Sequence, residues 1–285
     1  MTPDVAFTPK TAVIGALLAY ATASLLYVAG TTRFFRFTAH GLVAAGVILL
    51  SVSAQDQLIT TGNWAASAGP MLAAMIGAGA IAADRWLGVR LVPVMLVPFG
   101  MLVLLVRVFA APTPHMVPTP WITGFHVTTA LAGQVMAIAA CVLSILYLWQ
   151  HRALKQRRIM ELGSRIPSLE RLDEWLRIAL VTGFITLTLS LVTGALFMTA
   201  LPYGIAPGSS PQPSGAMLVA LRAKVMWAVA VWSWYLATLV ARNILRSPVR
   251  VIARMSVAGF ALISIAWFGL LFITSRPNLA IPLAG

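Results

Sequence analysis

The stretch WITGFHVTTALAGQVMAIAACVLSILYLW, residues 121–149, decides the fold of this chain because it contains no Lys, Arg, Asp or Glu. An α-helix rises about 1.5 Å per residue, so about 20 mostly apolar residues cross the hydrocarbon core of a membrane. The stretch exceeds that length and predicts a transmembrane helix. Similar apolar stretches recur on both sides of it, and together they predict eight spans at about 11–30, 37–55, 66–83, 89–111, 121–149, 175–200, 218–241 and 252–274.

The composition extends this expectation to the whole chain. Of its 285 residues, 60% are hydrophobic and 9% are charged, and the mean hydropathy is +0.90. Soluble globular proteins carry roughly 25% charged residues, so a water-soluble fold is excluded, and a disordered chain would leave too much apolar surface in water. We therefore predict an all-α fold, a polytopic transmembrane helix bundle of about eight spans, with residues 1–285 forming a single integral membrane domain. The N-terminal segment, which holds Asp4 and Lys10, lacks the pattern of a cleavable signal peptide.

Basic residues gather in alternate loops of this predicted bundle. The odd-numbered loops hold Lys and Arg, whereas the even-numbered loops hold almost none. Because such residues stay on the cytoplasmic side, the asymmetry predicts that both termini lie outside and that residues 151–174 form a cytoplasmic amphipathic loop with a short interfacial helix. The net charge of +13 then reflects membrane orientation and not nucleic-acid binding. We expect a multi-pass protein of the bacterial inner (plasma) membrane that contacts membrane lipid.

Several classes of function are excluded by what the sequence lacks. Cys141 is the single cysteine, so an internal disulfide, a CxxC redox pair and a CxxCH haem-attachment site are excluded. There is no P-loop, GxSxG or HExxH motif, and no nucleophile–base pair that would indicate an enzyme. We also expect no acidic residue within a helix, which argues against a proton- or cation-driven transporter.

Ionisable residues at membrane depth are costly, so each is a candidate functional residue. His126 lies in the helix predicted over 121–149, above a face of small residues that leaves room either for a flat cofactor or for a neighbouring helix. A haem needs an axial nitrogen for its iron and cations for its propionates. Without a haem, His126 is instead a buried imidazole that is hydrogen-bonded to the protein, and the cations extend to the lipid headgroups. The candidates predicted near the outer face are Arg107, His115, His126, Arg222 and Lys224.

Two further candidates lie elsewhere along the chain. His40, near the predicted inner end of the second span, is a ligand, a member of a proton relay or an interfacial residue, and the last is the expected role. Trp227 and Trp234 are seven residues apart and share one helical face. Such a stripe is more often used in helix packing than as the wall of a cofactor site.

Over residues 120–274 the chain resembles the cytochrome c assembly protein family, of the CcsA/CcmC type and closest to its eight-helix HemX/YpjD-like branch. No single motif is decisive, but their order and spacing carry the resemblance. The motifs are Phe125-His126-Val127 in a helix that ends with 146–155, the proline-led stretch 166–172, Gly183–Thr188 with Thr193-Gly194-Ala195, and Lys224, Trp227, Trp232 and Arg242 followed by Gly259-Phe260.

The resemblance implies a multi-helix bundle that handles haem in the membrane and presents it at the outer face to apocytochrome c. It implies that His126 is the axial ligand of a non-covalent b-type haem and that Lys224 is the family's basic residue after a tryptophan-rich loop. That loop is replaced here by residues 201–215, which contain no Trp, and Arg222 stands where the family has Asp. The second axial ligand stays open between His115, His40, a methionine such as Met116, and a partner protein.

The resemblance also defines the partners and the alternatives. It implies an apocytochrome c or a second cytochrome c maturation protein as partner. One alternative is a degenerate member that acts as a structural or regulatory membrane subunit without haem. Another alternative is a small-molecule transporter, although the first and third spans offer little polar lining beyond Ser, Thr and Gly.

Overall fold

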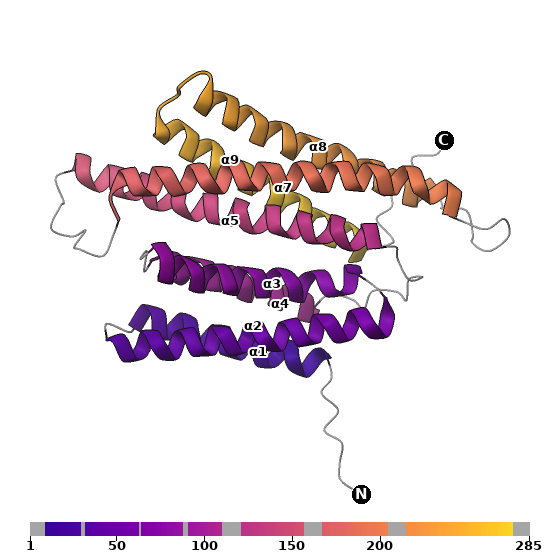
Figure 1. Ribbon diagram of the computed structural model, residues 1–285, viewed down its shortest axis with the longest axis horizontal. Coiled ribbons are helices and arrows are strands. Elements are labelled where there is room, and N and C mark those ends of the chain that lie inside the picture. The colour runs from indigo at the N-terminus through magenta and orange to yellow at the C-terminus, as the bar shows by residue number, and fades with distance from the viewer. Residues whose placement is uncertain are drawn as a thin grey trace, which may run out of the picture. The chain divides into compact units, whose positions relative to one another are not determined.

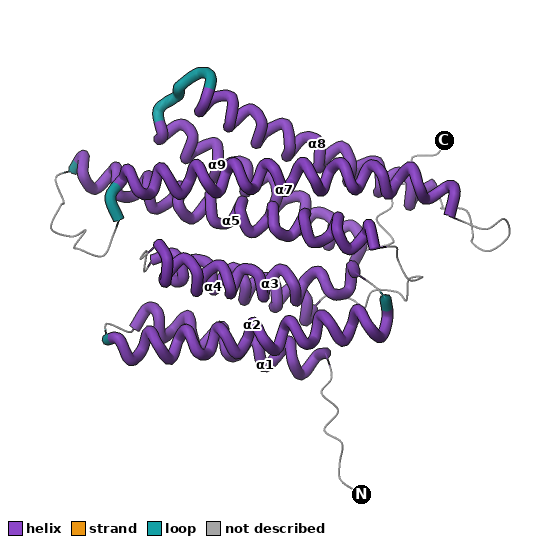
Figure 2. The backbone as a smooth tube through the Cα atoms, in the orientation of Figure 1, coloured by secondary structure: helices purple, strands orange, loops and turns teal. Residues whose placement is uncertain are grey.

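The computed structural model describes residues 9–29, 32–62, 64–87, 91–109, 121–156, 167–204 and 215–275. In these ranges the chain forms eight α-helices and one π-helical turn and no strand (Figures 1 and 2). The expected all-α bundle is confirmed. Six of the described helices are long and apolar enough to cross a membrane, and Leu91–Val106 is a shorter apolar helix. The orientation of the termini stays a prediction.

The described residues fall into two compact units. The first comprises Met1–Pro120 with Ile145–Trp175, and the second comprises Trp121–Ser144 with Leu176–Gly285. The chain passes between the units within two helices, α5 (Trp121–Lys155) and α7 (Leu169–Gly204).

The first unit contains a closed set of four helices. Helix α1 packs on α2 and α4, and α3 packs on the same two helices (Figure 1). A single π-helical turn, η1, extends α3 at its C-terminal end. The elements are α1 (Pro9–Ala29), α2 (Arg33–Thr61), α3 (Trp64–Ala82), η1 (Ala83–Leu87) and α4 (Leu91–Phe109).

Tyr20 of α1 fills the centre of this four-helix set. Its side chain is fully buried, and its hydroxyl donates a hydrogen bond of 2.9 Å to the backbone carbonyl of Ala73 on α3. Glycines on the three other helices, Gly46, Gly77 and Gly100, face the ring, and a Cβ on any of them would collide with it. Because glycine has no side chain, the ring of Tyr20 on α1 can contact all three of the other helices.

This packing predicts a site-specific effect of adding one methyl group. A Cβ at Gly46 would lie 2.6 Å from Cε1 of Tyr20, whose position is fixed by its hydrogen bond. We expect Gly46→Ala to destabilise the protein by about 1–3 kcal/mol through overpacking. Gly41→Ala on the same helix meets open space and should cost nothing. Thermal unfolding in detergent measures both, and equal melting temperatures for the two variants would contradict the packing.

The second unit contains a hairpin of two long helices. Helix α8 (Gly215–Asn243) packs on α9 (Val249–Ser275), and the turn between them includes Arg246 with a φ of 49°. The indole of Trp234 donates a hydrogen bond of 2.9 Å to the Met255 carbonyl across this hairpin. Gly259 allows the close approach, since a Cβ there would lie 2.9 Å from Cδ1 of Trp234.

Two expected loops are shorter than the sequence predicted. Helix α2 continues past Gln55 to Thr61 and ends at Gly62, whose left-handed φ of 62° terminates it. Helix α7 begins at Leu169, and Ser168 caps its first turn by accepting a hydrogen bond of 3.3 Å from the amide of Arg171. Residues 169–172 of the predicted 151–174 loop, where a short interfacial helix was expected, are therefore the first turn of α7, while residues 157–166 of that loop lie outside the described residues.

These longer helices contradict the expectation that no helix contains an acidic residue. Polar residues predict loops at these positions, but the helical backbone continues through them. The argument from missing acids against a proton- or cation-driven transporter therefore fails. The helical acids are Asp56 in α2, Asp84 in η1, and Glu170, Asp173 and Glu174 in α7.

Candidate functional site

His126 lies in the second turn of α5 and is half-buried against α7. Its Nδ1 is 2.8 Å from the backbone carbonyl oxygen of Ser190 and 3.3 Å from the hydroxyl of the same residue. A carbonyl oxygen only accepts hydrogen bonds, so Nδ1 carries the hydrogen and donates it. The lone pair is then on Nε2, and no hydrogen bond engages that nitrogen within the described part of the chain.

A notch in α7 receives the imidazole ring. The notch is formed by Gly194, where a Cβ would lie 2.8 Å from Cε1 and 3.1 Å from Nδ1 of His126. The hydroxyl of Thr193 donates to the Leu189 carbonyl at 2.8 Å and lies 3.1 Å from the Ser190 carbonyl, so the Ser190 oxygen has His126 Nδ1 as its closer side-chain donor. The ring is therefore held in one orientation by a hydrogen bond and by close contact with the α7 backbone.

The small residues below His126 on α5 are used for helix packing. A Cβ at Gly133 would lie 2.8 Å from Cδ2 of Leu187 on α7, and Ala137 is buried. The sequence left room at this face either for a cofactor or for a helix. At Gly133 the occupant is α7, so a cofactor bound to His126 would approach from the Nε2 side.

The predicted residues of α8 do not contact His126 through any hydrogen bond or ion pair in the described ranges. Arg222 and Lys224 are exposed on this helix. Trp227 donates its indole hydrogen to the Leu262 carbonyl of α9 at 3.0 Å. This contact uses the indole N–H in helix packing, as the seven-residue spacing of Trp227 and Trp234 suggested. A role of Trp227 at a cofactor stays a prediction.

Two predicted residues cannot be placed beside the others. His115 lies outside the described residues. Arg107 lies on α4, but its side chain is also outside the part of the chain that the structure describes. Their assignment to the haem site stays a prediction.

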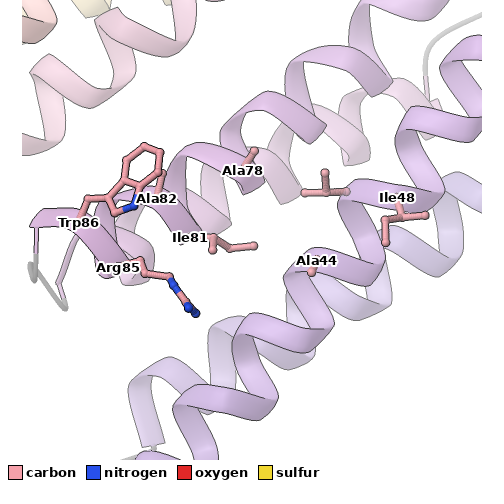
Figure 3. Close-up of a pocket in the computed structure, with 8 residues that line it drawn as sticks. Ala44, Ile48, Ala78, Ile81, Ala82, Arg85 and Trp86 are labelled. Carbon is pink, nitrogen blue, oxygen red and sulfur yellow. The ribbon is translucent and has the colours of Figure 1, made fainter.

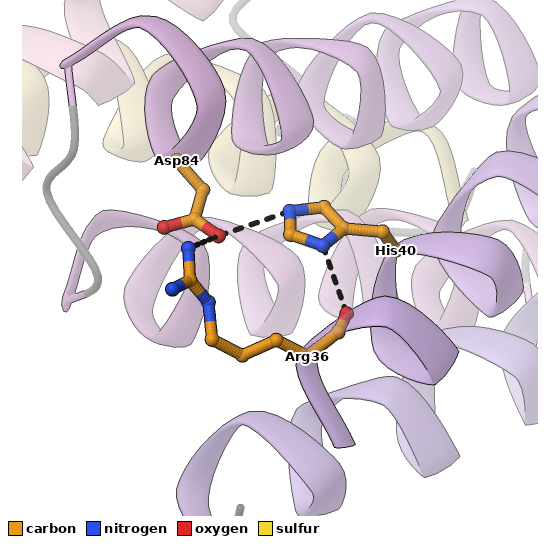
Figure 4. Close-up of polar contacts among 3 residues, drawn as sticks. All are labelled: Arg36, His40 and Asp84. Carbon is orange, nitrogen blue, oxygen red and sulfur yellow. Dashed lines mark hydrogen bonds and ion pairs between the residues drawn. The ribbon is translucent and has the colours of Figure 1, made fainter. Parts of the chain in front are cut away.

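His40 takes part in a charged cluster in the first unit (Figure 4). The carboxylate of Asp84 accepts a hydrogen bond of 2.7 Å from Nη2 of Arg36, and its same oxygen lies 3.0 Å from Nε2 of His40. Nδ1 of His40 donates to the Arg36 carbonyl at 2.8 Å, and the ring of Tyr27 meets the imidazole edge-on at 5.7 Å. The cluster therefore joins α1, α2 and η1.

Sequence reasoning missed Asp84, which is only 4% exposed. The end of the span predicted over 66–83 places Asp84 in a loop, whereas η1 continues α3 as far as Leu87 and turns the carboxylate of Asp84 toward α2. A signal was present, because Arg36 and His40 are one helical turn apart and therefore share a face. A face with two basic groups at a span end predicts an acidic partner nearby.

The described residues hold no group of three or more His, Cys, Asp or Glu side chains that could bind a bare metal ion. An axial haem ligand needs only one imidazole, so this finding is compatible with His126 as a ligand but not as part of a multi-residue metal centre.

Comparison with known proteins gives one match. The family described as "Cytochrome C assembly protein" matches residues 13–204. The match includes α1–α4, which the resemblance over 120–274 did not cover, and it ends before α8. No curated protein and no solved structure matches the chain.

Proposed function

Since this chain belongs to the cytochrome c assembly protein family, we propose that it binds and hands over haem during cytochrome c maturation, with His126 as an axial ligand. The family supports a role in cytochrome c maturation, and the helices support a multi-pass membrane protein. The haem ligand, the outer-face location and the bacterial inner membrane are parts of the proposal.

The hydrogen bond between His126 and the Ser190 carbonyl carries the proposal. Histidines that bind metals almost always donate their other ring hydrogen to a carbonyl, carboxylate or water, which fixes the tautomer and makes the ligand more basic. Here Nδ1 donates at 2.8 Å, and Nε2 keeps its lone pair. The donor set therefore fits an axial ligand, because within the described residues Nδ1 is hydrogen-bonded and Nε2 is not.

The remaining residues of the proposed site would bind the haem through their positive charge and would not react with it. When bound, haem supplies an iron with axial positions and two anionic propionates. Arg222 and Lys224 are exposed cations at the predicted outer end of α8 and are the proposed propionate partners, together with Arg107. His115 stays a candidate for the second axial position, whereas both ring nitrogens of His40 face other groups, the Arg36 carbonyl at 2.8 Å and the Asp84 carboxylate at 3.0 Å. The protein would hold and release its cargo without forming bonds as an enzyme does.

Two measurements test this function. The full chain, purified in detergent and titrated with haemin, should shift and sharpen the Soret band of haemin in a saturable way, and cells lacking the chain should lose covalent haem from their cytochromes c. Haem binding with unchanged cytochrome c would overturn the maturation role. Loss of cytochrome c without any haem binding would favour the alternative of a family member that acts as a structural subunit.

The notch at Gly194 provides a second test that keeps the ligand in place. A Cβ at this position would lie 2.8 Å from Cε1 of His126, so Gly194→Ala must displace the ring from the Ser190 carbonyl. Loss of such orienting contacts costs about 10–100-fold in metal affinity, and we expect haem affinity to fall about 10-fold. Ala195→Val adds bulk at the exposed neighbouring position and should leave the titration unchanged. Equal affinities for the two variants would argue against the notch.

A further inference from the structure

An apolar groove of about 390 Å³ lies between α2 and α3 in the first unit (Figure 3). Its walls are aliphatic, and one end is closed by Arg85 and Trp86 of η1. The side chains that line its walls are Ala44, Val47 and Ile48 from α2 and Ala78, Ile81 and Ala82 from α3.

Arg85 is a cation without an acidic partner among the described residues. The nearest acid in the sequence, Asp84, is turned inward, where its carboxylate pairs with Arg36 and lies beside His40. Consecutive helical residues point in different directions, so Arg85 is exposed and its guanidinium reaches the end of the groove (Figure 3). A positive charge therefore stands at the end of an aliphatic channel.

Trp86 indicates the depth at which this end of the groove lies. Its indole is 82% exposed, although it belongs to a helix of membrane-spanning length and composition that runs from Ser67 to Trp86. Tryptophan is enriched where the headgroups meet the hydrocarbon, because its ring is apolar and its N–H is polar. Arg85 then lies at headgroup level, and the aliphatic walls extend from it into the hydrocarbon.

We propose that this groove is a specific site for a phospholipid with an anionic headgroup. One acyl chain lies along the aliphatic walls, and the guanidinium of Arg85 binds the phosphate through charge-assisted hydrogen bonds. A headgroup with a net negative charge is favoured, because the choline cation of a zwitterionic lipid offsets the attraction of its phosphate for Arg85. Anionic lipids are enriched at the surface where positively charged segments gather, and each basic residue near such a surface contributes about 1 kcal/mol. The site is separate from His126, so the proposal does not depend on haem.

Native mass spectrometry of the full chain with phosphatidylglycerol and phosphatidylcholine tests the site. We expect phosphatidylglycerol to be retained preferentially, and Arg85→Gln to weaken its binding by about fivefold, since that factor corresponds to about 1 kcal/mol. Arg33→Gln, at an exposed arginine outside the groove, is the matched control and should have no effect. Equal retention of the two lipids, or equal effects of the two variants, would overturn the proposal.

A second pair of variants distinguishes the contribution of the aliphatic groove to lipid binding from that of the Arg85 charge. Ala78→Leu fills the groove and should reduce retention of phosphatidylglycerol while Arg85 stays in place. Ala45→Leu adds the same bulk at an exposed position of α2 outside the groove and should not change retention. Melting temperatures in detergent show whether each variant is folded. If folded Ala78→Leu protein retains lipid like the control, or if an uncharged isoprenoid co-purifies in the groove, the phospholipid assignment is wrong.

Discussion

The His126→Ala variant, purified in detergent and titrated with haemin, is expected to lose the Soret shift that haem binding produces in the natural sequence. Substituting partners of a metal ligand costs about 10–100-fold in affinity, and removal of the ligand itself should cost on the order of 100-fold or more. The effect should exceed that of Gly194→Ala, which displaces the imidazole but keeps it. The measurement is the haem dissociation constant, followed at the Soret maximum.

His151→Ala is the matched control for this experiment. His151 also lies on α5 and is half-buried, but its ring stacks on Tyr147 with centroids 6.1 Å apart. We expect its removal to leave haem affinity unchanged. A Soret shift that survives in His126→Ala would refute the ligand assignment, and absence of the shift from every variant, including the natural sequence, would favour the structural subunit.

The contrast between these two histidines shows what the sequence could predict. Apolar stretches and alternating charge predicted eight helices, because burial of backbone hydrogen bonds in lipid leaves few other structures. The pattern also identified His126 as an unusual residue at membrane depth. It did not identify Ser190 as the acceptor of its ring hydrogen, because that contact depends on how α5 and α7 are rotated against each other.

Helix ends were predicted less well than helix existence. The sequence placed breaks where polar residues begin, but backbone hydrogen bonding continued α2 to Thr61 and extended α3 through η1. As a result, Asp84 was expected in a loop, although it is a buried acid. The spacing of Arg36 and His40 indicates an acidic partner nearby, but it does not identify Asp84, because that pairing depends on how α2 packs against α3 and η1.

The Asp84→Asn variant is expected to show the largest loss of stability in the first unit. It removes the negative charge that Nη2 of Arg36 approaches at 2.7 Å and leaves this guanidinium without its acidic partner, while Nε2 of His40 lies 3.0 Å from the same oxygen. Removal of one partner of a buried ion pair costs about 3–5 kcal/mol. We expect about 3 kcal/mol, because the side chain of Arg36 is 30% exposed and water screens part of its charge.

A double variant distinguishes loss of the ion pair from loss of packing. If charge pairing is the main contribution, Arg36→Met combined with Asp84→Asn should be less destabilised than the sum of the two single variants, because neither charge is then left unpaired. Asp56→Asn, at an exposed acid of α2, should change the free energy of unfolding by less than about 0.5 kcal/mol. Strictly additive effects in the double variant would show that Asp84 contributes through packing alone, and α1, α2 and η1 would then be joined without the charged cluster.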